Sequence, residues 1–186
     1  MKVVSIVGMS GAGKSEAAAE FANSGFTRIR FGDITDEEVK KRGLALNEKN
    51  ERYVRELLRQ EGGMSAYARL NLPGIDAALV NADVVIDGLY SWEEYLFLKE
   101  HYGDDFYLVA VYSSPRIRHM RLSTRNHRPL TAEEAVSRDK AEIENLNKGG
   151  PIALADFTIE NESSMDDLKE KTREVIKKIV CCHRED

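Results

Sequence analysis

The sequence predicts an α/β fold in which helices cover both faces of a parallel sheet. Short runs of consecutive apolar residues, which are typical of buried strands, alternate with longer stretches of helical periodicity. A glycine-rich loop joins the first of these runs to the first helical stretch. Alternating strands and helices favour parallel pairing through right-handed crossovers. At 186 residues, the chain is expected to form a single three-layer domain, residues 1–186.

Five segments are expected to be strands. The longest are continuous apolar runs, which suit strands that are covered on both faces. In chain order, the expected strands are residues 3–7, 26–31, 84–86, 107–112 and 157–159.

Seven helices are expected between and after these strands, and several begin at recognisable caps. Ser91 and Thr131 each precede a glutamate by three residues, as in a capping box, and Thr35 is expected to cap another helix. The glycine pairs at residues 62–63 and 149–150 are expected to be flexible joints. The expected helices are residues 15–22, 36–42, 47–60, 92–100, 114–125, 131–145 and 165–180.

The composition excludes several classes of protein. A formal net charge of −5 argues against a general nucleic-acid binder, because no overall positive field attracts a phosphate backbone. No apolar run approaches the roughly 20 residues that a membrane span needs. Cys181 and Cys182 are adjacent and form no disulfide framework, which favours the cytoplasm. A monomer or homodimer without nucleic-acid or membrane partners is therefore expected.

The glycine-rich loop matches the pattern G-x-x-x-x-G-K-[ST] in full. Its glycines let the backbone wrap phosphates with the N–H groups inward, at the positive end of a helix dipole. Lys14 is expected to neutralise the β- and γ-phosphates, and Ser15 to bind Mg²⁺. The nucleotide-binding residues are Gly8, Met9, Ser10, Gly11, Ala12, Gly13, Lys14 and Ser15.

Asp87 ends an expected strand, at the edge where open α/β sheets place their ligands. It is expected to bind Mg²⁺ with Ser15, the alternative being an ordinary turn. The nucleotide is expected to be ATP. GTPases recognise guanine through the motif Asn-Lys-x-Asp. The similar run Asn147-Lys148-Gly149-Gly150 lacks the aspartate, which argues against a GTPase.

Arginines gather after the strand at residues 107–112. Phosphoryl transfer concentrates negative charge that must be neutralised away from water, so arginines should converge on it. Arg121 and Arg125 share a helical face, and a basic turn then leads to a second helix that carries Arg138. Residues of about 122–140 could thus form a small helical lid over the phosphates, with a solvated basic helix as the alternative. The arginines of the first helix and the turn are Arg116, Arg118, Arg121, Arg125 and Arg128.

The acceptor side is expected between the second and third strands. Asp33 follows the second strand, where it could orient or deprotonate an acceptor hydroxyl or could cap the next helix. Residues of about 34–82 are too many for a simple crossover and should form acceptor-binding helices. Arg55 and Arg69 are candidates to clamp an anionic acceptor, with surface ion pairs as the alternative.

With these features together, the chain resembles the nucleoside monophosphate kinase branch of P-loop proteins, which includes adenylate kinase and dephospho-CoA kinase. It also resembles an archaeal family of adenylate-kinase-related, dephospho-CoA-kinase-like proteins. The resemblance implies a five-stranded sheet of order 2-3-1-4-5. It also implies that Arg121 and Asn161 lie at the adenine, and that Arg125 and a lid arginine such as Arg128 meet the phosphates. The segments that carry it are residues 8–15, 31–33, 86–91, 111–125 and 155–162.

Two functions follow from these observations. The first is a kinase that transfers the γ-phosphoryl group of ATP·Mg to a small acceptor, of the nucleoside monophosphate or dephospho-CoA type. The second is an ATPase that acts as a regulatory or assembly switch with a protein partner. Residues 34–82 match neither the adenylate kinase nor the dephospho-CoA kinase acceptor pattern, so the sequence does not identify the acceptor. A kinase should hydrolyse ATP slowly until its acceptor is present.

Overall fold

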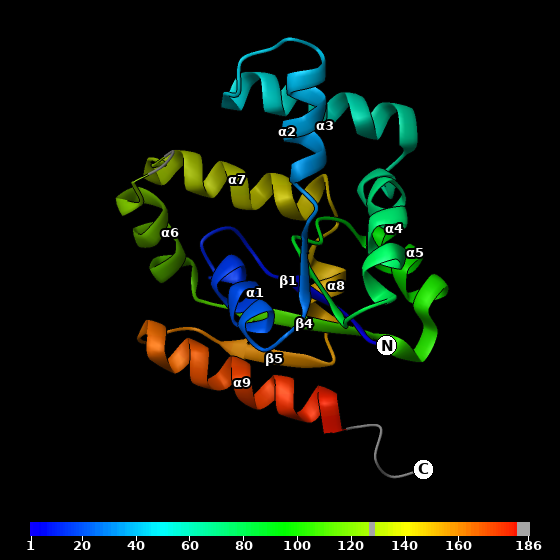
Figure 1. Cartoon of the computed structure of the whole chain (residues 1–186). Helices are drawn as coiled ribbons and strands as arrows, with labels where there is room; N and C mark the ends of the chain where they lie inside the picture. The colour runs from blue at the N-terminus through cyan, green and yellow to red at the C-terminus, as the bar shows by residue number, and fades with distance from the viewer. Residues whose placement is uncertain (127–128, 182–186) are drawn as a thin grey trace.

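The computed structural model of the chain describes residues 1–126 and 129–181. Within these ranges, five strands form one parallel sheet in the order β2-β3-β1-β4-β5 (Figure 1). This confirms the order that the family resemblance implies. The strands are β1 (Val3–Val7), β2 (Thr27–Arg30), β3 (Val84–Asp87), β4 (Phe106–Tyr112) and β5 (Phe157–Glu160).

The register of the sheet places the functional loops at one edge. Val3 of β1 pairs with Val84 of β3 and with Phe106 of β4, so these strands start level with one another. Ile6 pairs with Asp87 near the other end. Because the strands are parallel, the segments that follow β1, β2, β3, β4 and β5 emerge at the same edge.

Helices cover both faces of the sheet. On one face, Val4 and Ile6 pack in a core shared with α1 (Lys14–Asn23) and α9 (Met165–Cys181). On the other face, Val3 and Val7 pack in a core shared with α4 (Ala66–Leu79) and α5 (Trp92–Tyr102), which lie side by side at the right of Figure 1. This alternation follows from the period of two along a strand.

Three helices fill the long connection between β2 and β3, where only two were located from the sequence; the helix at residues 66–79 was missed. They are α2 (Asp33–Lys41), α3 (Glu48–Gly62) and α4, and α2 and α3 stand at the top of Figure 1. Asn47 caps α3 by accepting the Asn50 N–H at 2.9 Å. After β4, α6 (Pro115–Thr124) and α7 (Ala132–Glu144) form the helical pair expected as a lid. A short α8 (Gly149–Ala153) precedes β5, and a 3₁₀ turn (Gly103–Asp105) follows α5.

Two of the three expected capping residues lie at helix starts. Thr131 and Glu134 form a complete box on α7, with bonds of 3.2 and 2.8 Å. Ser91 caps α5 by accepting the Glu94 N–H at 3.1 Å. The Glu94 carboxylate instead accepts the Tyr90 N–H, one residue earlier, at 2.7 Å.

Two expectations about local structure were wrong. Thr35 does not cap a helix, because α2 begins at Asp33; its buried hydroxyl instead lies 2.5 Å from the Tyr67 hydroxyl. Gly149 and Gly150 are not a loose joint, because they begin α8. A Cβ on Gly150 would lie 2.7 Å from the Trp92 ring, so this glycine lets the two segments pack closely.

No helix in the described ranges combines the length and the apolar character needed to cross a membrane.

Candidate active site around the phosphate loop

The loop of residues 8–15 runs from the end of β1 into the first residues of α1. Gly8 adopts φ 149° and Gly13 φ 103°, which side chains disfavour. A Cβ on Gly8 would lie 2.3 Å from the Val111 carbonyl oxygen, and one on Gly13 would lie 2.4 Å from Asn161 Nδ2. The glycines are thus required by the backbone shape and by close neighbours.

The start of α1 fits an anionic ligand. Gly13 occupies the N-cap position, and no side chain of the described residues caps the helix there. The first N–H groups of a helix lack partners inside the helix and carry partial positive charge. A glycine cradle in front of such a helix start has the form that binds phosphates.

Lys14 and Ser15 lie where the pattern predicts. The half-buried Lys14 donates a hydrogen bond from Nζ to the Met9 carbonyl at 3.0 Å. Burial first, and then the nearby Lys148 and Arg138, lower the pKa of Lys14 to about 7 in spite of the opposite effects of Glu142 and Asp87. The lysine therefore lies among other cations and would gain from a polyanionic partner.

The residues expected at the metal are close together. Ser15 Oγ lies 3.4 Å from Asp87 Oδ1, and Asp87 is buried at the end of β3. A hydroxyl and a carboxylate that leave the other positions to phosphate oxygens and water suit Mg²⁺. The second Asp87 oxygen pairs with the Arg28 guanidinium on β2, a contact that the sequence analysis missed.

The helices expected as a lid contact the phosphate loop mainly at Ser10. Arg118 on α6 is buried and donates to the Ser10 carbonyl at 3.1 Å, while its guanidinium pairs with both Asp139 oxygens at 2.7 Å. Arg138 on α7 donates to Ser10 Oγ at 2.9 Å. Glu142 on the same helix also binds Ser10, so α6 and α7 hold one loop residue between them.

Arg121 and Asn161, the pair implied at the adenine, are in contact. Arg121 donates to Asn161 Oδ1 at 3.2 Å and to Ser113 Oγ at 3.0 Å. Asn161 in turn donates from Nδ2 to the Ala12 carbonyl at 2.8 Å. These contacts join the segments after β4 and β5 to the phosphate loop.

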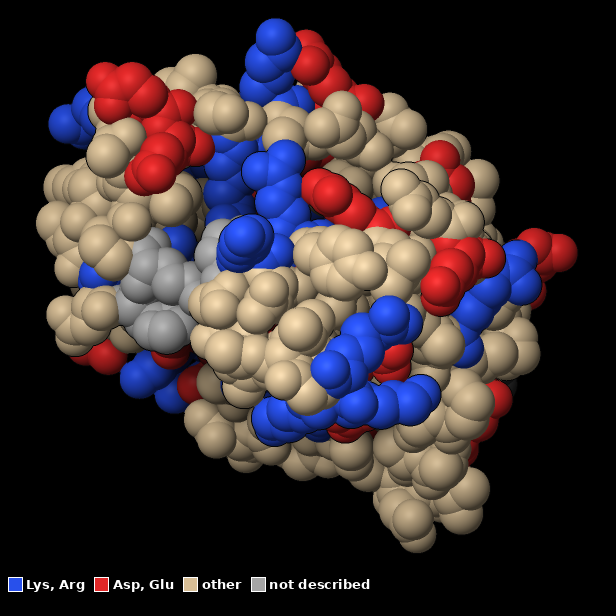
Figure 2. Space-filling view, turned by 90° about the horizontal axis from the view of Figure 1, so that it is seen from above, with Lys and Arg blue, Asp and Glu red and all other residues tan. Residues whose placement is uncertain are grey.

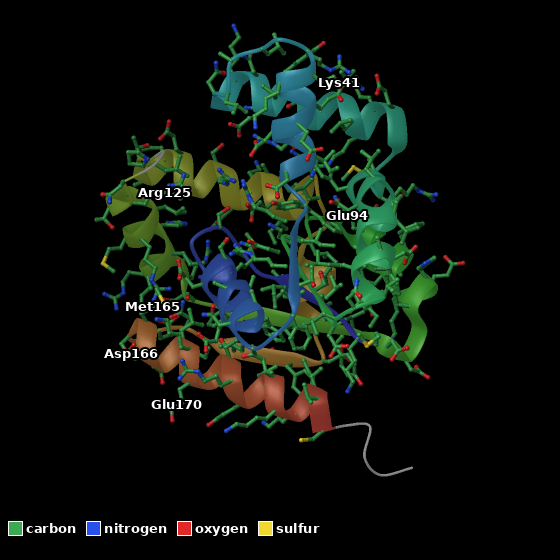
Figure 3. All side chains as sticks on the ribbon, viewed as in Figure 1. Lys41, Glu94, Arg125, Met165, Asp166 and Glu170 are labelled. Carbon is green, nitrogen blue, oxygen red and sulfur yellow. The ribbon has the colours of Figure 1, made fainter. Side chains whose placement is uncertain are left out.

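Of the two arginines expected at the phosphates, only Arg125 lies in the described part of the chain. Figure 3 shows Arg125 at the outer end of α6, where the chain turns toward α7. Arg128 lies outside the described residues. Arg118 and Arg138 both contact the phosphate loop.

On the acceptor side, each of the three expected residues contacts a different neighbour. Asp33 is the first residue of α2 and pairs with Arg30 at 3.0 Å while half exposed. Arg55 Nη1 lies 3.6 Å from the buried Glu51 carboxylate. Arg69 donates to Ser65 at 3.0 Å and lies over the Phe97 ring of α5, on the exposed surface.

A polar cluster of Tyr67, Tyr90, Glu94 and Arg59 links the insertion helices α3 and α4 to the segment that leads into α5. The guanidinium of Arg59 lies 5.2 Å from the Tyr67 ring centre, and that ring packs edge-on against Tyr90. Among the described residues, Glu94 Oε1 and Arg59 Nε find no hydrogen-bond partner. Figure 3 labels Glu94 between the sheet and the insertion helices. Burial raises the pKa of Glu94 to about 7, although Tyr90, Arg59 and Ser91 oppose this.

Basic side chains gather on one face of the molecule even though the whole chain is acidic. Figure 2 looks down on the molecule from above the view of Figure 1 and shows Lys and Arg in a band across the middle of that face. The formal net charge of the chain is −5, so this band is a local feature. Its sign suits a polyphosphate or another anionic ligand.

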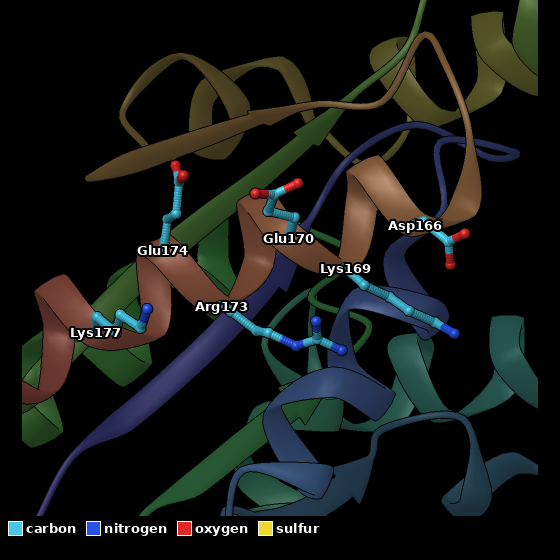
Figure 4. A pocket seen from close by; sticks show the side chains of 6 residues that line it. All are labelled: Asp166, Lys169, Glu170, Arg173, Glu174 and Lys177. Carbon is cyan, nitrogen blue, oxygen red and sulfur yellow. The ribbon is translucent and has the colours of Figure 1, made fainter.

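A hollow on α9 is of a different kind, because one helix supplies its whole lining (Figure 4). Glu170 and Glu174 point to one side of the helix, and Lys169 and Arg173 point to the other. Arg173 pairs with Glu20 of α1 at 2.6 Å. These charges do not converge on one point, as expected for the solvated face of a helix.

The comparisons with known proteins agree with this geometry. A family model described as an AAA domain matches residues 4–145. A UPF0200 protein from Thermococcus gammatolerans is 36% identical over 182 residues, which cover 96% of this chain and 95% of the relative. Another, from Halobacterium salinarum, is 34% identical over 177 residues, covering 95% and 93%. The chain belongs to the UPF0200 family. This confirms the expected relation to P-loop, kinase-like archaeal proteins.

Solved structures of two kinases have the same fold as this chain. Shikimate kinase from Acinetobacter baumannii aligns with a TM-score of 0.61 at 14% identity, over 100% of this chain and 96% of that one. Dephospho-CoA kinase from Campylobacter jejuni aligns with a TM-score of 0.55 at 15% identity, over 96% and 97%. At such identities the likeness shows the fold alone, which is that of P-loop kinases.

Proposed function

We propose that this UPF0200 protein is an ATP·Mg-dependent small-molecule kinase. It would transfer the γ-phosphoryl group to a nucleotide or nucleotide-like acceptor, of the nucleoside monophosphate or dephospho-CoA type. The observation that carries the proposal is the shape of residues 8–15, with Lys14 beside the loop and Ser15 Oγ 3.4 Å from Asp87. All three parts are needed to hold a triphosphate with its metal.

In this reaction an acceptor hydroxyl oxygen forms a bond to the γ-phosphorus, and the bond from that phosphorus to the β–γ bridging oxygen breaks. ADP leaves, and the hydroxyl proton passes to a base or to the phosphoryl product. Mg²⁺, when bound, neutralises charge on the phosphate oxygens. Lys14, Arg125 and Arg128 would stabilise the same charge.

The remaining residues are assigned by the same proposal. Ser15 and Asp87 would hold the metal, while Arg121 and Asn161 would border the adenine. Asp33 would orient or deprotonate the acceptor hydroxyl, with Arg55 and Arg69 at the acceptor anion. The fully buried Glu94 is a further candidate on this side, because its free oxygen and raised pKa suit proton transfer.

A coupled assay for ADP, with nucleoside monophosphates and dephospho-CoA as acceptors, tests the proposal. We expect one acceptor to raise turnover well above the rate with ATP·Mg alone, and Lys14→Ala to abolish the increase. Lys41→Ala, which changes a lysine that is 79% exposed, is the matched control. If no acceptor raises turnover and a partner protein does, the chain is a switch ATPase instead.

The role of Asp33 can be tested in the same assay. Asp33 and Asp36 both contact Arg30, at 3.0 and 3.6 Å. We expect Asp33→Asn to lower kcat at least tenfold and Asp36→Asn to leave it nearly unchanged. Equal effects of the two substitutions would mean that only the ion pair with Arg30 matters.

A further inference from the structure

Glu142 brings a carboxylate from α7 directly against the phosphate loop. One of its oxygens accepts the Ser10 main-chain N–H at 3.2 Å and the Lys148 ammonium at 3.0 Å. The other accepts the Ser10 hydroxyl at 2.5 Å and lies 3.5 Å from Arg138 Nε. A main-chain amide, a hydroxyl and two cations are also the groups that bind phosphoryl oxygens. The carboxylate thus uses donors that a phosphate would use.

Lys148 is the unusual member of this set. Its side chain is 1% exposed, and its Nζ lies 5.5 Å from the Tyr90 ring centre. It follows Asn147, which adopts φ 51°, a conformation rare for residues other than glycine. This strained turn between α7 and α8 directs a lysine into the interior. A buried ammonium is costly without an anionic partner, so Lys148 needs either Glu142 or a substitute.

Around Glu142, the positively charged side chains outnumber the carboxylates that can pair with them. Asp87 is already paired with Arg28. Glu142 is then left beside Lys148, Arg138 and Lys14. Burial alone would raise the pKa of Glu142, but Lys148, Lys14 and the Ser10 hydrogen bond lower it to about 2. One carboxylate cannot neutralise both Lys148 and Arg138, whereas a terminal phosphoryl group carries more charge.

The helix that carries Glu142 is held by few apolar contacts. Val136 and Ile143 are 58% and 46% exposed on α7 and line a groove of about 680 Å³ between this helix and the sheet. The polar contacts at Ser10 and Asp139 therefore contribute much of what positions α7. Elements with few buried apolar contacts move at low cost. Withdrawal of Glu142 is compatible with an intact sheet and core.

We propose that Glu142 and the terminal phosphoryl group of ATP compete for one subsite, formed by the Ser10 amide, Arg138 and Lys148. Lys148 passes from the carboxylate to the phosphoryl group when ATP binds, and it thereby holds the group that is transferred. ADP lacks this group and does not displace Glu142. The inference rests on the proposed function, because it assumes that residues 8–15 bind ATP.

The competition predicts opposite effects for the two partners of one ion pair. Glu142→Gln removes the competing charge, so it should tighten a non-hydrolysable ATP analogue with Mg²⁺ about tenfold. Lys148→Met removes a ligand of the phosphoryl group, so it should weaken the analogue about tenfold or more; the loss of one charged hydrogen bond corresponds to this factor. Affinity for ADP·Mg should change less than twofold in both variants.

Titration calorimetry with the analogue and with ADP measures these affinities for the full chain. Lys2→Met is the matched control, because Lys2 is also buried but donates to the Ile179 carbonyl on α9. It should leave the ratio of the two affinities unchanged. If Lys148→Met fails to fold, Lys148→Arg replaces it; this variant keeps the charge and should retain the preference for the analogue. Glu142→Gln then tests by itself whether the analogue affinity rises as expected.

The outcomes separate this inference from the proposed function. If both variants shift the analogue affinity in the same direction, or shift analogue and ADP equally, the pair is merely structural and the competition is wrong. If the unmodified protein binds neither nucleotide, the proposed function fails and the subsite fails with it. A larger rise in melting temperature with the analogue for Glu142→Gln than for the unmodified protein would support the inference independently.

Discussion

At the scale of single residues, the site is defined by charges that are not balanced locally. Lys14 lies near Lys148 and Arg138, and its pKa falls to about 7 as a result of burial and these neighbours. The pKa of Glu94 is shifted upward, because this carboxyl is fully buried. It therefore keeps a proton at pH values where exposed glutamates have lost theirs. Perturbed groups of this kind cluster at functional sites.

The raised pKa of Glu94 predicts a pH dependence of stability. Below pH 4.5 the group is protonated in the folded and unfolded chains alike. As pH rises toward about 7, only the unfolded chain releases the proton, so the free energy of unfolding falls. The loss contributed by this group is on the order of 3 kcal/mol and is complete above pH 7.

Urea denaturation between pH 4.5 and 8 measures this contribution. We expect Glu94→Gln to lose less stability over this range than the unmodified protein. Glu100→Gln, an exposed position on the same helix, should follow the unmodified protein. Parallel curves for all three proteins would show that Glu94 is ionised in the folded state.

At the scale of elements, short segments orient the functional side chains. The short helix α8 begins at Gly149 directly after Lys148, and it packs against α5 through Gly150 and Trp92. The position of Lys148 therefore depends on a close contact between helices rather than on the loop alone.

The two glycines of α8 form a matched pair for testing this contact. Gly150→Ala would place a Cβ 2.7 Å from the Trp92 ring, whereas at Gly149 the nearest atom is Ile143 Cδ1 at 3.8 Å. We expect Gly150→Ala to lower the free energy of unfolding by about 1–3 kcal/mol. Gly149→Ala should be neutral or stabilising by up to about 1 kcal/mol. Thermal and urea denaturation would detect the difference, and equal effects would contradict close packing at Trp92.

At the scale of the whole molecule, the parallel sheet brings distant segments to one edge. Asp87, Arg118 and Glu142 lie on a strand and two different helices, yet all three contact the same loop. A ligand that contacts all of these segments would bind the folded chain and not the unfolded one. Such binding stabilises the fold by mass action.

Thermal denaturation with nucleotide tests this coupling. At a free ATP·Mg concentration of about 100 times Kd, we expect stabilisation by about 2.7 kcal/mol. For a chain of this size, this corresponds to a rise in Tm of roughly 5–10 °C. Lys14→Ala should remove most of the rise and Lys41→Ala should keep it. An unchanged Tm at saturating nucleotide would contradict a phosphate site at residues 8–15.

The sequence by itself determined the strands, the phosphate loop and the position of Asp87 at the end of a strand. Each is a local pattern: consecutive apolar residues form strands buried on both faces, and glycines at fixed spacing precede a helix. The strand order came from the family resemblance that these motifs carry.

Only the tertiary structure decided which polar groups meet. Lys148 belonged in sequence to an incomplete guanine motif, and Glu142 lay unremarked on the same expected helix as the lid candidate Arg138. Arg28 was one charged residue of an expected strand, and Glu94 looked only like part of a helix cap. Their contacts join positions up to 132 residues apart. Such pairs depend on how helices pack on the sheet, because long-range contacts leave no periodic trace in the chain.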